Sequence, residues 1–225
     1  SGSEADNWAL FGAMRAMAGK NHIVTTQIEH HAVLNACAAL ERLGYEVSYV
    51  PVDRQGRVDP AAIENAVRPE TGMISVMLAN NEVGTTQPIS EIAKVAHRYG
   101  ALMHTDAVQA VGHIPVDVEA LDVDLLSISA HKFCGPKGIG ALYIRNGVKM
   151  TNLIYGGEQE RGLRAGTENT PAIVGMGKAL SLSRAELEQT AERIRALRNL
   201  LEGEITRRFP NAIVNGGREN RLPGT

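Results

Sequence analysis

Residues 124–144, with the sequence DLLSISAHKFCGPKGIGALYI, decide the fold because a strand pattern, a turn pattern and one lysine follow each other there. The apolar run 124–129 is short and bounded by polar residues, which predicts a buried strand. The sequence GPKGI at 135–139 predicts a turn, and the alternating run 140–144 predicts another strand. Lys132 therefore lies at the end of a strand, where open α/β proteins bind their ligands.

The position of Lys132 has two interpretations, although the chain contains only six lysines. It can be a solvated charge in a loop, as most lysines are. It can also be an amine partly shielded from water, able to form a Schiff base with an aldehyde cofactor. Position alone does not decide between them.

The composition indicates a globular protein that acts on small molecules. The chain has 225 residues, of which 44% are hydrophobic, enough for a substantial core. Its 23 basic and 25 acidic residues form no long block of one charge, which argues against nucleic acid or a membrane surface as partner. Cys37 and Cys134 are too few for a disulfide framework and too isolated for a zinc site, so we expect no metal and a reducing, cytoplasmic location.

Helical and strand patterns alternate along the first part of the chain. Expected strands cover residues 22–26, 45–50, 72–78, 101–106, 124–129 and 140–144. Expected helices cover residues 4–18, 32–44, 60–67 and 89–100. This alternation predicts an α/β fold with a mostly parallel sheet sandwiched by helices.

The pattern changes at Pro171, where one or two long, highly charged helices extend to about Phe209. A short strand and a turn are expected after them. We therefore predict a large domain at 1–170, and a second part at 171–225 that comprises an interdomain helix and the start of a smaller domain.

Several polar residues follow the expected strands. Asp106 ends the strand 101–106, and it can either cap a helix or direct a fixed negative charge at a ligand. A pyridine cofactor needs such a carboxylate beside its ring nitrogen, because only the protonated ring withdraws electrons from a substrate. Asp106 and Lys132 thus form a pair with a chemical rationale.

Three further positions keep both a structural and a functional interpretation. His30 can be a surface residue at the start of a helix or an imidazole stacked on a flat ring, and its neighbour His31 points elsewhere, which argues against a metal pair. Asn81 can belong to a plain turn or donate its amide to a ligand oxygen. The loop 156–170, which contains Thr167, can be mobile surface or an anion site.

Six segments occur together in a characteristic order and at characteristic spacing. They are SGSEADN at 1–7, EHHAV at 29–33, NNEVG at 80–84, HTDAVQAVG at 104–112, SAHKFCGPKGIGAL at 129–142 and ERGLRAGTEN at 160–169. On these segments the chain resembles cysteine desulfurases that supply sulfur for iron–sulfur clusters, within the class V, fold-type I family of pyridoxal-phosphate enzymes. The resemblance covers nearly the whole chain, and it implies the fold-type I large domain, with a long helix leading into a truncated small domain.

The resemblance implies a role for each matching residue around the cofactor ring. Lys132 corresponds to the lysine that forms a Schiff base with pyridoxal 5'-phosphate, and Asp106 to the partner of the ring nitrogen. Gln109 corresponds to a donor to the phenolic oxygen of the ring. Asn81 corresponds to the asparagine near that oxygen and the substrate carboxylate, and His30 to the histidine stacked on the ring.

The resemblance also implies residues that bind the cofactor phosphate. Ser3, Ser129 and His131 match ligands from the same chain. Thr167 matches the residue that reaches the phosphate of the other subunit's cofactor, which implies a homodimer.

The implied reaction removes sulfur from L-cysteine. The substrate displaces Lys132 from the cofactor, and Lys132 or His30 takes the α-proton. An enzyme thiolate then accepts the sulfur as a persulfide, and alanine leaves. A sulfur-acceptor or scaffold protein is the implied partner, with no direct contact to nucleic acid or a membrane.

The family's sulfur-accepting cysteine lies on a mobile loop beyond the segment that matches 221–225, so we expect these residues to be the cofactor-binding core of a longer enzyme. Cys134 adjoins Lys132 at a fixed position, and Cys37 fits the apolar stripe of a helix, so neither is favoured as the nucleophile. Two alternatives stay open: a selenocysteine lyase or another class V lyase, and a cofactor-binding or dimerisation module without sulfur transfer.

Overall fold

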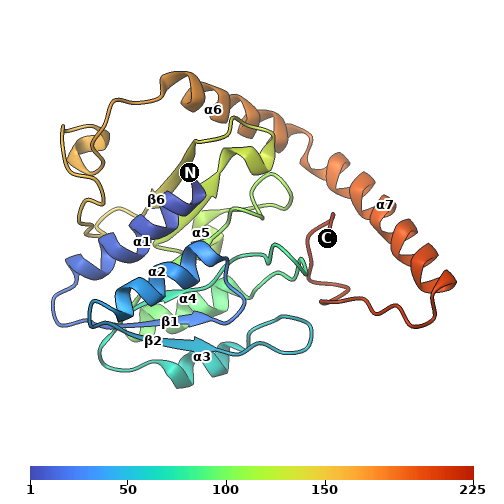
Figure 1. Ribbon diagram of the computed structural model, residues 1–225, viewed down its shortest axis with the longest axis horizontal. Helices are drawn as coiled ribbons and strands as arrows, with labels where there is room; N and C mark the ends of the chain where they lie inside the picture. Colours follow the sequence, from blue (N-terminus) through green and yellow to red (C-terminus); the bar gives the residue numbers. More distant parts are fainter.

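A six-stranded sheet with helices on both faces forms the body of the protein in the computed structural model, which describes residues 1–225 (Figure 1). The strands are β1 (His22–Thr26), β2 (Glu46–Val50), β3 (Thr71–Ser75), β4 (Leu102–Asp106), β5 (Leu125–Ser129) and β6 (Gly140–Ile144). The α-helices are α1 (Gly2–Ala16), α2 (His31–Glu41), α3 (Pro60–Ala66), α4 (Ile89–Arg98), α5 (Val118–Leu121), α6 (Thr170–Ala185) and α7 (Leu187–Arg208). The predicted α/β fold is confirmed.

The strand order is β2-β1-β3-β4-β5-β6, and every neighbouring pair is parallel except β5 and β6. All residues of β1 and β3 are buried, as expected for central strands of a parallel sheet that helices cover on both sides. The antiparallel β6 closes one edge, because the short connection after β5 is long enough to reverse direction but too short for a helical crossover.

Two apolar layers hold the helices on the sheet. On one face, Leu10 of α1 and Leu40 of α2 pack with Ile23 and Met73 of the sheet. On the other face, the larger cluster joins Ile63 of α3 and Ile92 of α4 to the opposite side of the same strands. By holding the helices and strands together, these two layers fix the position of the carboxyl end of each strand.

The carboxyl ends of β1, β3, β4 and β5 meet at one edge of the sheet. The chain passes outward from β1 to β2 and returns to β3 on the other side of β1. Such a reversal of strand order opens a crevice at the carboxyl edge, where ligands bind in open α/β sheets.

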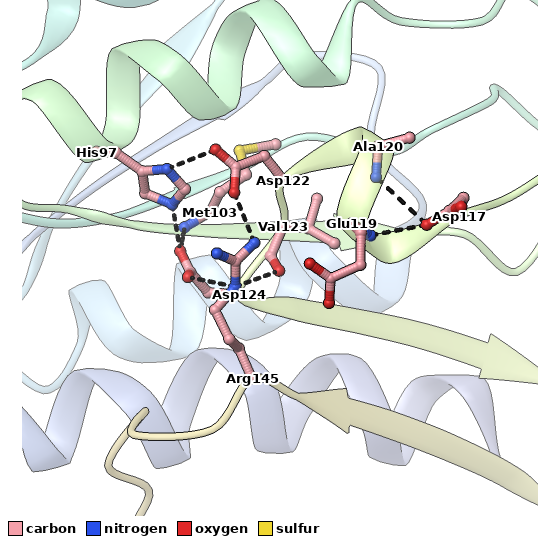
Figure 2. A network of polar contacts seen from close by, with 9 residues as sticks. All are labelled: His97, Met103, Asp117, Glu119, Ala120, Asp122, Val123, Asp124 and Arg145. Atoms are coloured by element: carbon pink, nitrogen blue, oxygen red, sulfur yellow. Dashed lines mark hydrogen bonds and ion pairs between the residues drawn. The ribbon is translucent and has the colours of Figure 1, made fainter.

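A polar network fastens the opposite end of the sheet (Figure 2). Asp124, just before β5, accepts hydrogen bonds from the backbone N–H of Met103 at 2.8 Å and pairs with His97 of α4 at 2.9 Å. Arg145, just after β6, contacts Asp124 at 3.3 Å and Asp122 at 2.7 Å. The network ties α4, β4, β5 and β6 together far from the carboxyl edge.

Helices α6 and α7 leave the sheet, and α7 projects away from the body (Figure 1). No residue of α7 is buried, and no helix of the protein is long and apolar enough to cross a bilayer. The strand expected after α7 is wrong: residues 209–225 contribute only an isolated bridge between Thr85 and Arg221. The apolar residues 212–214 do not pair with an edge strand of the sheet, and Ile213 is 85% exposed.

Candidate cofactor site

A cavity of about 430 Å³ lies at the carboxyl edge of the sheet, a size typical of small-molecule sites. It is lined by eight of the nine residues predicted from sequence: Ser3, His30, Asn81, Asp106, Gln109, Ser129, His131 and Lys132. The ninth, Thr167, is exposed on the loop before α6 and does not line the cavity. Elements that are distant in sequence therefore bring the predicted residues together.

Lys132 is held in a tight turn between β5 and β6. The segment Ala130–Phe133 forms a short 3-10 helix there, where a loop was expected. A side chain on Gly112 would lie 2.5 Å from the Cβ of Phe133, and Gly112 has a φ of +83°. Because the turn after Asp106 packs so closely on this 3-10 helix, the two elements fix Lys132 and Asp106 relative to each other.

The amino terminus of α1 forms one end of the cavity. Ser1 caps the helix by accepting a hydrogen bond from the N–H of Glu4 at 3.3 Å. A Cβ on Gly2 would lie 3.2 Å from the Cβ of Ser129, whose hydroxyl is 2.9 Å from Nδ1 of His131. Free backbone N–H groups at a helix start, next to a hydroxyl and an imidazole, suit a bound phosphate.

Asp106 is a buried carboxyl at the end of β4. Its Oδ1 accepts a hydrogen bond from the N–H of Val108 at 2.8 Å, so it caps a turn as well as lining the cavity. Burial raises the pKa of Asp106, while the Val108 N–H and the nearby His30 and Lys132 act in the opposite direction. A cationic ring nitrogen placed here would favour the carboxylate further.

His30 caps α2 through its side chain. Its Nδ1 accepts a hydrogen bond from the N–H of Ala32 at 3.1 Å, so in the neutral ring the proton resides on Nε2. The ring of His31 lies 6.3 Å away at an interplanar angle of 70°, an edge-to-face arrangement. His30 is thus oriented by its own helix.

The two neighbouring asparagines after β3, Asn80 and Asn81, have different roles. Asn80 is buried, accepts hydrogen bonds from the N–H groups of Glu82 and Val83, and donates to the carbonyl of Ile28. Through these hydrogen bonds, Asn80 stabilises the turn after β3. Asn81 makes none of these contacts and lines the cavity.

The sequence was compared with known proteins. Residues 1–224 match the family described as aminotransferase class V. The chain belongs to this family. It is 53% identical over 223 residues to "Cysteine desulfurase IscS" of Dictyoglomus turgidum, an alignment that covers 99% of this chain and 57% of that protein.

Solved structures agree with this assignment. A structure titled "NIFS-LIKE PROTEIN" superposes with a TM-score of 0.94 at 43% identity, covering 99% of this chain and 61% of that one. One titled "SspA in complex with cysteine" superposes with a TM-score of 0.77 at 44% identity, covering 80% and 53%. The chain therefore spans little more than half the length of the relatives that it matches.

The class V aminotransferase family depends on pyridoxal phosphate, and the cavity fits this group. It presents an amine at Lys132, a buried carboxyl at Asp106 and a hydroxyl at Ser129. The absence of a side chain at Gly2 leaves the helix start open to the cavity, since a Cβ would lie 3.0 Å from the Cγ2 of Val108. An aldehyde-bearing pyridine phosphate requires three features in its site: an amine, a carboxyl and a region that binds an anion. The cavity has all three.

Two buried carboxyls near the cavity, Asp6 and Glu29, were missed in the sequence. Asp6 is 1% exposed and lines the cavity, and Glu29 is 4% exposed. Asp6 shares one face of α1 with the buried Gly2, Leu10 and Ala13. The sequence offered one signal for Asp6, because it places an acidic residue on the face of the first helix that is otherwise apolar.

The free cysteines lie in contrasting places. Cys37 is fully buried in α2, and burial raises the pKa of its thiol to about 12, which disfavours the thiolate. Cys134 is exposed and ends the 3-10 helix of Lys132 in a left-handed conformation, with a φ of +63°. It does not line the cavity.

Proposed function

We propose that the complete protein is a pyridoxal-phosphate-dependent cysteine desulfurase, which converts L-cysteine and an enzyme thiol to alanine and an enzyme persulfide. The observation that supports this most is the convergence of Lys132 and Asp106 on one cavity in a chain 53% identical to a cysteine desulfurase. Atoms and electrons balance without an outside oxidant, because the sulfur that leaves the substrate carbon bonds to the enzyme sulfur.

The bound cofactor would supply an electron-withdrawing ring that eases loss of the α-proton of the substrate. Asp106 would hold the proton on the ring nitrogen by charge. The amine of Lys132, once released by the substrate, and Nε2 of His30 are the groups able to take the α-proton. Ser129 and His131, with Ser3 at the start of α1, would bind the phosphate, while Gln109 and Asn81 would orient the ring oxygen.

A second cavity of about 410 Å³ adjoins the first and shares His30 and Asn81 with it. We propose that the amino-acid substrate approaches from this side, since this cavity also contains His30, a candidate base. Arg54 lines this second cavity and offers a charge for a carboxylate.

We further propose that the complete protein works as a homodimer in which Thr167 serves the partner's cofactor, and that a sulfur-acceptor or scaffold protein receives the persulfide sulfur. The exposed position of Thr167 outside its own cavity supports the first part. The acceptor would belong to iron–sulfur cluster assembly or a thiolation route, in a cytoplasmic setting.

Borohydride reduction of the cofactor-loaded complete protein, followed by peptide mapping, tests the site. We expect the label on Lys132, including in a Lys137→Ala variant, because Lys137 is the other lysine that lines the cavity. A label on Lys137 in the unaltered protein would overturn the assignment.

The reaction is tested separately by supplying cysteine or selenocysteine and measuring alanine and protein-bound sulfane sulfur. We expect persulfide formation with cysteine in the complete protein. We expect none in the isolated 225-residue chain, whose two cysteines do not line the cavity. Persulfide on Cys134 of the isolated chain would contradict this, and turnover of selenocysteine alone would identify a lyase instead.

A further inference from the structure

Three buried carboxyls lie at or near the candidate cofactor site. Asp6 of α1, Glu29 after β1 and Asp106 of β4 are 1%, 4% and 5% exposed. The charge of Asp106 raises the pKa of both Asp6 and Glu29, and the charge of Glu29 raises that of Asp6. Three like charges are not held together in a region shielded from water, so at least one of these groups must carry a proton.

Hydrogen bonds identify the group that is least suited to a negative charge. Glu29 accepts from the hydroxyl of Thr26 at 2.6 Å and from the N–H of Met77 at 3.1 and 2.9 Å. Asp106 accepts from the N–H of Val108 and is further favoured as an anion by His30 and Lys132. Both have donors or cations that stabilise the carboxylate, although burial outweighs the donors at Glu29 and raises its pKa to about 8.

Asp6 has much weaker support as an anion. Its Oδ1 is fully buried and has no hydrogen-bond partner. The nearest imidazole, His104, lies 3.8 Å from this oxygen, and burial lowers the pKa of His104 to about 3, so the ring is neutral. The hydroxyl of Ser127 is the one hydrogen-bonding group that lowers the pKa of Asp6.

We propose that Asp6 is a positioning residue that carries a proton at neutral pH, so that Asp106 is the charged carboxyl of the pair and Asp6 its neutral, hydrogen-bonded neighbour. The groups that act on Asp6 are Asp106 and the neutral His104 from β4, Ser127 from β5 and Glu29 from the loop after β1. On α1 itself, Glu4 is paired with Arg164 at 2.9 Å. None of them supplies a positive charge to Asp6.

The hydrogen bonds of His104 leave a donor available to Asp6. Nδ1 of His104 lies 2.8 Å from the hydroxyl of Ser75, and Nε2 lies 3.0 Å from the hydroxyl of Ser127. If Nε2–H donates to Ser127, the hydroxyl of Ser127 is free to donate to Asp6, and Ser75 donates to Nδ1. The chain of donors then runs from β3 through β4 and β5 toward Asp6 of α1.

The effect of Asp6 on the cofactor rests on the proposed function, whereas its protonation is a property of the protein alone. Three variants of the complete protein separate the two: Asp6→Asn, which keeps shape and neutrality, Asp6→Leu, which loses the acceptor for Ser127, and Asp106→Asn as the matched change at the charged carboxyl. The readouts are pyridoxal-phosphate affinity and the pH midpoint of the visible absorbance of the bound cofactor.

We expect Asp6→Leu to weaken cofactor affinity at least about tenfold and Asp6→Asn to rescue it to within about threefold of the unaltered protein. Asp106→Asn should weaken affinity at least about tenfold and shift the pH midpoint. If Asp6→Asn behaves like Asp106→Asn, Asp6 is charged and the proposal fails. If Asp6→Leu has the affinity and midpoint of the unaltered protein, Asp6 does not position the site.

Infrared difference spectra of the cofactor-free protein at neutral pH test the protonation directly. Because the pKa of Glu29 is raised to about 8, Glu29 also contributes to the carbonyl band of protonated carboxylic acids. We expect this band in the unaltered protein to lose part of its intensity in Asp6→Asn and the remainder when Glu29→Gln is added. A band of unchanged intensity in Asp6→Asn would overturn the proposal. Absence of the band would overturn the proposal even if Asp6→Leu fails to fold. If the band is present but no protein binds pyridoxal phosphate, the protonation stands while the proposed function and the positioning role fail.

Discussion

At the scale of single residues, the interior of the sheet contains a histidine without charge. His104 is fully buried, with both ring nitrogens hydrogen-bonded to serine hydroxyls. Burial lowers its pKa to about 3 from an ordinary value of 6.5. In the unfolded chain the same ring binds a proton below about pH 6.5, so the unfolded state takes up more protons as the pH falls.

We therefore expect His104 to make the free energy of unfolding fall as the pH is lowered from about 6.5 toward 3. The variant His104→Gln cannot take up this proton, and its stability should depend less steeply on pH in that range. Urea unfolding of the complete protein at a series of pH values measures both slopes. Equal slopes would mean that His104 is charged in the folded state or that it titrates alike in both states.

At the scale of secondary-structure elements, one buried aspartate joins α4 to three strands. The side chain of Asp124 is 8% exposed and contacts His97, Arg145 and the N–H of Met103 (Figure 2). Asp122 contacts the same histidine and arginine, but its side chain is 43% exposed. Two carboxyls with shared partners thus differ mainly in their access to water.

We expect Asp124→Asn to destabilise the protein by about 3 kcal/mol, because it leaves His97 and Arg145 without a buried anion. The same change at Asp122 should cost less than about 1 kcal/mol, since water screens an exposed pair. Asparagine also tolerates the left-handed backbone of Asp122, which has a φ of +54°. Urea unfolding midpoints compare the two, and a larger loss for Asp122→Asn would contradict this explanation.

Sequence patterns predicted the strands of the sheet well, and they missed the shortest helix and misplaced one strand. The strands at 22–26 and 140–144 were predicted with the bounds that the structure has. Helix α5 has four residues and depends on the Asp117 side chain, which accepts from two backbone N–H groups, so it leaves no periodic signal. The expected strand after α7 failed because pairing depends on a neighbour that sequence does not reveal.

The candidate site was predictable where a motif places a residue at a strand end, as for Asp106 and Lys132. It was not predictable where the role depends on burial. In the sequence, Asp6 looks like an ordinary helix residue. Only the structure shows that it is buried and that its Oδ1 has no hydrogen-bond partner. The role of Thr167 stays a prediction, because it depends on a second chain.

At the scale of the whole molecule, α7 exposes an apolar surface that nothing in this chain covers. Leu197, Leu200 and Leu201 are 57%, 64% and 62% exposed, whereas the sheet is covered on both faces. Exposed apolar groups of this kind favour association in water.

We expect the isolated 225-residue chain to self-associate, and the double change of Leu197 and Leu201 to lysine to reduce this association. Gln189→Lys is the matched control, because it adds a charge on α7 without removing apolar surface. Sedimentation velocity at several concentrations measures the effect. Equal association of all three proteins would show that another surface is responsible.

The start of α1 packs against the start of β6, so residues near opposite ends of the sheet-forming segment are neighbours. A Cβ on Gly140 would lie 2.7 Å from the backbone carbon of Ser1. During translation, residues 1–7 are therefore made long before the strand that completes their surroundings. The cavity can form only after residue 140 has left the ribosome. A cofactor of the proposed kind would therefore not act as an early folding template, and its binding would follow the long-range pairing of the sheet.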